Sequence, residues 1–203
     1  MAVNPMLHLP GEPLTAKESD YVRYATLELN AREINLRKIQ GNIAEVGVWK
    51  GNFAELLNRY FPDRKLYLFD TFEGFDERDK KIDINCSYST TTQDFTETSI
   101  LEVMNKMTYP DNVIIKKGWF PETAVDVDGK FAFVDLDADL YQPIYEGLKF
   151  FYPKMEKGGI IMVHDFNNEM YKGVRQAVEE YCQMEGVSYL CLPDVWGSVV
   201  IIK

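Results

Sequence analysis

"VSYLCLPDVWGSVVIIK", residues 187–203, ends the chain and decides the fold. It holds two runs rich in β-branched and aromatic residues, and the few residues between them include Pro193 and Gly197. A connection this short can join only antiparallel strands, because a parallel pair needs a crossover of a dozen or more residues. We therefore predict a C-terminal hairpin whose last strand runs against the rest of the sheet, at or near its edge.

Upstream of this hairpin, short apolar runs alternate with helical patterns, which predicts a doubly wound, mostly parallel α/β sheet of seven strands. An antiparallel ending is typical of the Rossmann-like class I methyltransferase fold and not of a dehydrogenase-type nucleotide fold. The predicted strands before the hairpin are residues 42–48, 65–70, 112–118, 130–136 and 158–165. The predicted helices are residues 15–39, with Thr15 or Ser19 as a cap, and residues 51–61, 97–107, 144–155 and 171–186.

Composition limits the classes of function. The 203 residues suit one domain, residues 1–203, and the net charge of -10 argues against binding to nucleic acid or to an anionic membrane. The N-terminus has neither a basic region nor a long apolar segment, so we expect no signal peptide and no membrane span. Three scattered cysteines without a C-x-x-C pair indicate reduced thiols and a cytoplasmic location.

Two segments are candidates for mobile or interacting parts. Residues 76–95 are long and polar and follow a strand end, so we predict a lid loop that covers an acceptor molecule. The N-terminal helix, at about residues 15–40, is a candidate for docking on a second copy in a homo-oligomer.

The loop "EVGVWKG", residues 45–51, has the pattern E-x-G-x-x-x-G. A dinucleotide fingerprint would need a second glycine at the position of Trp49, where a bulky indole argues against close approach of a diphosphate. Gly47 permits a tight turn, and Gly51 lets the next helix start close to the strand. The same pattern is also compatible with a plain strand-to-helix turn.

Two further loops complete a candidate cofactor site. Asp70 ends its strand 23 residues after Gly47 and precedes Thr71, and a carboxylate at this place can accept hydrogen bonds from both hydroxyls of a ribose. In "KKGWFPET", which contains Gly118, either Trp119 or Phe120 can pack on an adenine. An adenosine without a phosphate indicates S-adenosylmethionine, whose zwitterionic methionine end would be held by backbone groups and an acid such as Glu45.

In "FVDLDADLYQP", residues 133–143, carboxylates stand at alternate positions, and a metal ion, a substrate or a turn can explain them. Alternation places Asp135 and Asp137 on one face if the strand continues, and Asp139 is a candidate cap for the following helix. Asp165 ends the neighbouring strand, next to His164. Oxygen ligands from acids and amides suit a divalent cation, for which we expect Mg²⁺.

Several stretches, in this order along the chain, resemble the macrocin O-methyltransferase family, whose members methylate sugars on macrolide and aminocoumarin antibiotics. The resemblance implies a class I fold, S-adenosylmethionine and a divalent metal. Asp137 matches the first acid of the family's D-G-D-L-Y, a metal ligand and possible base. His164 and Asp165 stand where the family has two aspartates, so His164 replaces the first. The stretches are "GNIAEVGVWKGNFAELL", "LFDTFEGF", "KGWFPET", "DLDADLYQP", "FFYPKMEKGGIIMVHD" and "GSVVIIK".

A second register stays open. "FVDLDADLY" also resembles the D-x-x-x-D-x-Y run of catechol and caffeoyl-CoA O-methyltransferases, in which Asp135 would be the metal ligand. The expected function is metal-assisted O-methylation of a sugar or glycosylated small molecule, with Asp137 or His164 taking the proton. The alternatives are a catechol-type O-methyltransferase and a non-catalytic protein that binds S-adenosylmethionine. An NAD-type oxidoreductase is disfavoured by the absent G-x-G-x-x-G and by the terminal hairpin.

Overall fold

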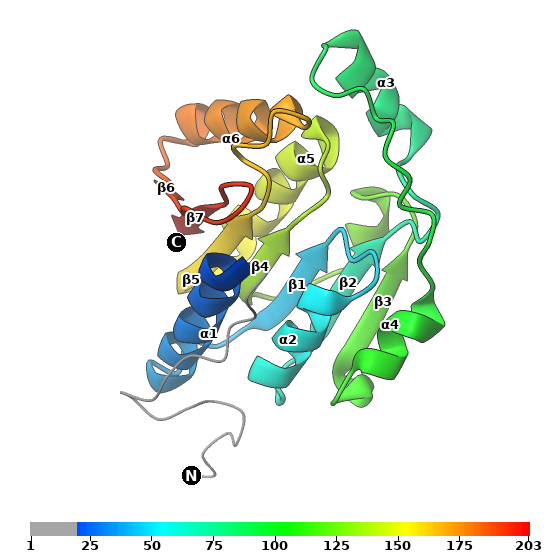
Figure 1. The fold of residues 1–203 in the computed structure, drawn as a ribbon. Coiled ribbons are helices and arrows are strands. Elements are labelled where there is room, and N and C mark those ends of the chain that lie inside the picture. The colour runs from blue at the N-terminus through cyan, green and yellow to red at the C-terminus, as the bar shows by residue number, and fades with distance from the viewer. Residues whose placement is uncertain (1–19) are drawn as a thin grey trace.

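A seven-stranded sheet runs through residues 20–203, which are the residues that the computed structural model describes (Figure 1). The strand order is β3-β2-β1-β4-β5-β7-β6. Strands β1 to β5 pair in parallel, whereas β7 is antiparallel to both β5 and β6. The predicted sheet and its C-terminal hairpin are therefore confirmed. The strands are β1 (Asn42–Val46), β2 (Leu66–Asp70), β3 (Val113–Lys117), β4 (Phe131–Leu136), β5 (Met155–Val163), β6 (Leu190–Cys191) and β7 (Val199–Ile202).

Helices cover both faces of this sheet, because side chains along each strand alternate between two cores. Leu68 packs into the core under α1, α2 and α4, and its neighbour Phe69 packs into the core under α5 and α6. Among the helices of residues 20–203, none is long and apolar enough to cross a membrane. The helices are α1 (Tyr21–Leu36), α2 (Asn52–Tyr60), α3 (Glu77–Asn85), α4 (Ile100–Lys106), α5 (Tyr141–Phe151) and α6 (Lys172–Glu185).

The N-terminal helix is shorter at its C-terminal end than the sequence indicates. It was predicted to continue to about residue 40, and α1 ends at Leu36. Residues 15–19, with both predicted caps, lie outside the described residues. At the start of the described helix, Asp20 is the N-cap residue, and its side chain makes no capping hydrogen bond.

The first half of the predicted lid segment, residues 76–95, is not a loop, because α3 forms there; that the segment covers an acceptor stays a prediction. Asp76 caps this helix by accepting the N–H of Arg78 at 2.9 Å. The buried side chains of α3 are Asp79 and Asp83, one turn apart, so the helix carries carboxylates where an apolar stripe would normally reveal it. Residues 86–99 remain without a helix or strand.

Each buried aspartate of α3 binds a neighbouring element. Asp83 accepts the backbone N–H of Tyr141 at 3.1 Å, at the start of α5. Both oxygens of Asp79 lie 3.0 Å from the indole nitrogen of Trp119. Burial raises the pKa of Asp79 to about 7, although the hydrogen bond from Trp119 acts in the opposite direction. α3 is therefore docked through polar contacts whose strength depends on pH.

Gly47 offers a test of the contact between β1 and β4. Its φ is +88°, and a Cβ atom there would lie 2.1 Å from the carbonyl oxygen of Asp137. We expect Gly47→Ala to lower the free energy of unfolding by about 3 kcal/mol or more, from backbone strain plus the clash. The matched control is Gly186→Ala, because Gly186 has φ +64° and open space around it. It should cost only about 1–2 kcal/mol. Equal losses in urea denaturation would contradict the close approach.

Asp79 should make the stability of the protein depend on pH. Between 3.8, its ordinary pKa, and about 7, the folded state keeps a proton that the unfolded state releases. Stability therefore falls as the pH rises through this window. The free energy of unfolding of wild type should decrease relative to Asp79→Asn between about pH 4 and pH 7. Trp119→Phe, which removes the opposing N–H, should move the window to higher pH. If the free energies of unfolding of wild type and Asp79→Asn changed in parallel with pH, the raised pKa of Asp79 would be contradicted.

Candidate active site

The carboxyl ends of the parallel strands open into one pocket of about 400 Å³. This is the edge at which open α/β sheets bind ligands, and the volume is within the usual range for a small molecule. Two of the predicted site residues, Gly51 and Asp135, do not line it. The predicted residues that do line it are Glu45, Gly47, Asp70, Thr71, Gly118, Trp119, Asp137, His164 and Asp165.

Asp70 holds the loop after β1 in place. Its Oδ2 accepts the backbone N–H groups of Val48 at 2.7 Å and Trp49 at 2.8 Å, and its Oδ1 accepts that of Phe72 at 2.6 Å. A carboxylate offers about four acceptor sites, so these bonds leave about one for a ligand. Asp70 thus shapes the pocket floor as well as lining it, which the sequence pattern did not indicate.

The other loop residues have mainly architectural contacts. Gly51 begins α2 at φ +74°, where a Cβ would meet the side chain of Val103 at 3.0 Å. The hydroxyl of Thr71 donates to the carbonyl of Gly74 at 2.5 Å, and the N–H of Gly118 donates to the carbonyl of Asp70 at 2.9 Å. Their predicted contacts with a cofactor stay predictions.

Of the two aromatic candidates for an adenine wall, Trp119 is the better placed. Phe120 is buried and packs against Phe69 and Phe151 in the core under α5. Trp119 lines the pocket, and the guanidinium of Arg78 lies 3.7 Å from the centre of its ring. One face of the indole is therefore occupied by a cation from α3, which fixes its orientation.

Arg23, which was not predicted, brings a buried cation into the site. One guanidinium nitrogen, Nη2, lies 2.8 Å from Asp135 Oδ2 and 2.8 Å from Asp137 Oδ2, and the guanidinium also packs 4.2 Å from the ring centre of Phe53. A signal was present in the sequence. Arg23 precedes Leu27 by four residues, so it stands on the buried stripe of α1, where a charge needs a partner inside the protein.

The acids that face Arg23 are almost completely enclosed. Glu45 and Asp135 occupy paired positions on β1 and β4 and are 1% and 0% exposed. Burial raises the pKa of Asp135 to about 6 and that of Glu45 well above its ordinary value, even with Arg23 nearby. Asp135 and Asp137 lie on one face, as predicted, and both bind the same nitrogen of Arg23.

Asp137, Asp165 and His164 form the second half of the site. The Nδ1 atom of His164 lies 3.0 Å from Asp137 Oδ1 and 2.7 Å from Asp165 Oδ2. Burial alone would lower the pKa of His164, but the two carboxylates outweigh it and raise the pKa to about 11. Arg23 and His164 hold the pKa of Asp137 below its ordinary value, against the effect of burial. The sequence prediction that these three residues meet is therefore supported by their geometry.

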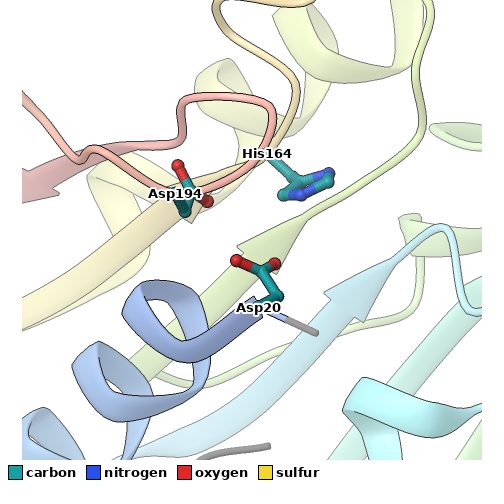
Figure 2. A group of neighbouring side chains, drawn as sticks. All are labelled: Asp20, His164 and Asp194. Carbon is teal, nitrogen blue, oxygen red and sulfur yellow. The ribbon is translucent and has the colours of Figure 1, made fainter. Parts of the chain in front are cut away.

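His164 also faces a second pair of acids, which the sequence did not indicate. Figure 2 shows Asp20, from the start of α1, and Asp194, from the turn between β6 and β7, which form a triangle with the histidine. One ligand atom from each of the three residues lies within 4.8 Å of the others. Both oxygens of Asp194 already accept bonds from the backbone and hydroxyl of Ser198, each at 2.5 Å. Asp194 therefore serves first to hold its turn.

The predicted role of Asp139 is wrong. Leu140 is the N-cap residue of α5, and the side chain that accepts a hydrogen bond at this helix start is Asp83. Asp139 has φ +61° and lines the pocket. Burial, and then the charges of Asp165 and Asp137, raise the pKa of Asp139 well above its ordinary value. The left-handed backbone turns this third carboxyl toward the acids rather than along the helix.

The arrangement fits both predicted ligands. At one end of the pocket, Asp70 and Trp119 offer a carboxylate and an aromatic wall, as an adenosine requires. At the other end, Asp137, His164 and Asp165 have ligand atoms within 4.8 Å of one another. Two carboxylates and an imidazole suit a divalent cation, which His164 would bind in its neutral form.

Relatives of known activity match most of this chain. Mycinamicin III 3''-O-methyltransferase of Micromonospora griseorubida is 26% identical over 172 residues, which cover 74% of this chain and 63% of that protein. Demethyldecarbamoylnovobiocin O-methyltransferase of Streptomyces niveus is 26% identical over 157 residues, which cover 70% and 58%. The chain thus spans about three fifths of the length of these curated relatives.

Solved structures share the fold. The O-methyltransferase NovP has a TM-score of 0.73 and 21% identity, covering 90% of this chain and 80% of its own. The calicheamicin methyltransferase CalS11 has a TM-score of 0.67 and 19% identity, covering 89% and 79%. The family model for macrocin-O-methyltransferase (TylF) matches residues 20–195, which include every predicted site residue. The chain belongs to the macrocin-O-methyltransferase (TylF) family.

Proposed function

We propose that this protein is an S-adenosylmethionine-dependent, metal-assisted O-methyltransferase that acts on a sugar hydroxyl of a glycosylated small molecule. One observation carries the proposal: a single pocket joins the carboxylate of Asp70 to the group of Asp137, His164 and Asp165. Relatives support the acceptor class, since one is named for the 3''-hydroxyl of mycinamicin III and another for the 4'-hydroxyl of a rhamnosyl tetracenomycin.

The cofactor end of the pocket has the chemistry that S-adenosylmethionine needs. The bound cofactor would supply an activated methyl group on its sulfonium. Asp70 would accept a hydrogen bond from a ribose hydroxyl, and the free face of Trp119 would pack on the adenine. Gly47 would allow the chain after β1 to pass close to the ligand. Thr71 and Gly118 would shape the loops on either side of the adenosine.

Asp137 and Asp165 would hold a divalent cation, with His164 as a third ligand or as the base. Mg²⁺ is our expectation for the metal. A cation at this place would lower the pKa of the acceptor hydroxyl. The protein then has to position that hydroxyl and receive its proton, and Asp137 and His164 are the groups beside it. Arg23 fixes Asp137 Oδ2 and leaves Oδ1 toward the histidine.

A catechol-type O-methyltransferase, with Asp135 as the ligand, has less support. Asp135 is fully buried behind Arg23 and does not line the pocket. A non-catalytic role would leave the acidic group at Asp137 and Asp165 without a purpose. A single domain over residues 1–203, a cytoplasmic location and a homo-oligomer stay predictions from the sequence.

The cofactor prediction is tested by calorimetry with S-adenosylhomocysteine. Wild type should bind it, and Asp70→Asn should weaken binding by about 1–3 kcal/mol, because a charged acceptor is lost. Asp126→Asn is the control, since Asp126 is exposed and pairs with Lys116 outside the pocket. Equal affinity in wild type and Asp70→Asn would remove Asp70 from the site. Tighter binding of NADH than of S-adenosylhomocysteine would contradict the methyltransferase proposal.

The metal prediction is tested by binding of Mn²⁺, followed by electron paramagnetic resonance. Asp137→Asn and Asp165→Asn should each weaken binding about tenfold or more, because a carboxylate ligand becomes an amide. Asp194→Asn is the matched control, because Asp194 also faces His164 but belongs to the other acid pair.

Activity provides the second measurement of the metal role. Once an acceptor is found, chelation should abolish methyl transfer while S-adenosylhomocysteine still binds. Full activity in excess chelator would contradict the metal proposal. If only Asp194→Asn weakened the binding of Mn²⁺, the cation would instead belong to the group of Asp20, His164 and Asp194.

A further inference from the structure

Arg23 occupies a fixed position at the end of the pocket opposite Trp119. Its side chain comes from α1, is 7% exposed and lines the pocket. Asp135 and Asp137 hold the guanidinium through Nη2, and the ring of Phe53 supports it from one side. A guanidinium has five N–H donors in a rigid plane, so holding one nitrogen orients all the others.

Three polar atoms in this region are buried and have no hydrogen-bond partner. They are Arg23 Nε, a donor, and Glu45 Oε2 and Asp135 Oδ1, both acceptors. Leaving such groups unsatisfied costs free energy, and two of the three belong to residues that line the pocket, Arg23 and Glu45, whereas Asp135 lies behind them. The two unpaired groups of the lining residues indicate a ligand that supplies the missing partners. The required ligand presents an anion to the arginine and a cationic donor to the acids. An α-amino acid zwitterion has this pair of groups on one carbon atom.

The order of the strands places Arg23 where the amino acid end of the cofactor would lie. Trp119 follows β3, Asp70 ends β2, Gly47 follows β1, and Arg23 lies over the ends of β1 and β4. A ligand whose adenine lies at Trp119 and whose ribose lies at Asp70 therefore extends across Gly47 toward Arg23 and Glu45. This is the order of groups in S-adenosylmethionine, from base to amino acid.

We propose that Arg23 binds the carboxylate of the cofactor's methionine end, while Glu45, with Asp135 behind it, accepts hydrogen bonds from the ammonium group. The inference rests on the proposed function, because it assigns a new residue to the same cofactor. α1 becomes part of the cofactor site rather than an accessory helix. Lysine is a poor substitute at this position, because its ammonium is a point charge on a flexible stem, whereas the planar guanidinium binds both aspartates through one nitrogen and keeps its other N–H groups in a fixed direction.

The experiment compares two ligands that differ in the amino acid end. S-adenosylhomocysteine has that end, whereas 5'-methylthioadenosine shares the adenosine and the thioether but lacks it. Calorimetry should show that Arg23→Gln lowers the affinity for S-adenosylhomocysteine by about tenfold or more and leaves the affinity for 5'-methylthioadenosine unchanged. Arg23→Lys should give a smaller loss with the same selectivity. Hydrogen exchange adds a second measurement, because only S-adenosylhomocysteine should protect the first turns of α1.

A control on the same helix separates this role from a structural one. Arg32 is also buried, pairs with Glu28 at 2.6 Å and does not line the pocket. Arg32→Gln should leave the ratio of the two affinities as in wild type. Equal losses for both ligands in Arg23→Gln and Arg23→Lys would make Arg23 purely structural and overturn the inference, and so would an unchanged affinity for S-adenosylhomocysteine. If Arg23→Gln does not fold, Arg23→Lys decides by the same ratio.

The proposed function can fail separately from this inference. Absence of binding of both ligands to wild type would overturn the cofactor assignment and the role of Arg23 with it. Binding of both ligands with no effect of Arg23 would overturn only the role of Arg23.

Discussion

The balance of charge around Arg23 is the interaction on which the site depends. Glu45, Asp135 and Asp137 come from the ends of two neighbouring strands; the first two are buried, and the side chain of Asp137 is 23% exposed. Charges in such surroundings must be paired or lose their charge. Arg23 binds two of these acids directly. The pKa values of Glu45 and Asp135 are nevertheless raised, first by burial and then by the charges of the neighbouring acids.

This constraint explains the unusual character of α1. Its buried side chains include Arg23, Glu28 and Arg32 beside Leu27 and Ile34, so it has no clear division into an apolar and a polar face. A helix that only covered a sheet would be amphipathic. α1 instead brings charges to particular partners, and Glu28 and Arg32, farther along the helix than Arg23, pair with each other.

A second balance of charge involves His164 and the acids around it. The histidine belongs to two groups of acids, one with Asp137 and Asp165 and the other with Asp20 and Asp194. An aspartate at this position would add a negative charge to a group that already holds several. The histidine instead provides a positive charge or a neutral ligand, depending on whether a cation is bound. His164 therefore changes how the charge of this pocket is neutralised.

Sequence reasoning succeeded where local patterns report the structure directly. The alternation of strands and helices, the short connection before residues 199–202 and the acids at the strand ends are local features, and they identified the fold, Asp70 and the group around Asp137. The predictions failed where the structure depends on contacts between residues that are far apart in the sequence. α3 hides its buried face in Asp79 and Asp83, Asp139 points away from the helix that it precedes, and Arg23 lies 112 residues from its partner Asp135.

The sequence by itself therefore determined which strands form the sheet and which acids gather at its edge, because hydrophobic periodicity and turn chemistry act over a few residues. Only the tertiary structure decided how those acids are neutralised. Charge pairing between α1, β4 and the residues after β5 depends on distances in space, and no spacing along the chain records it.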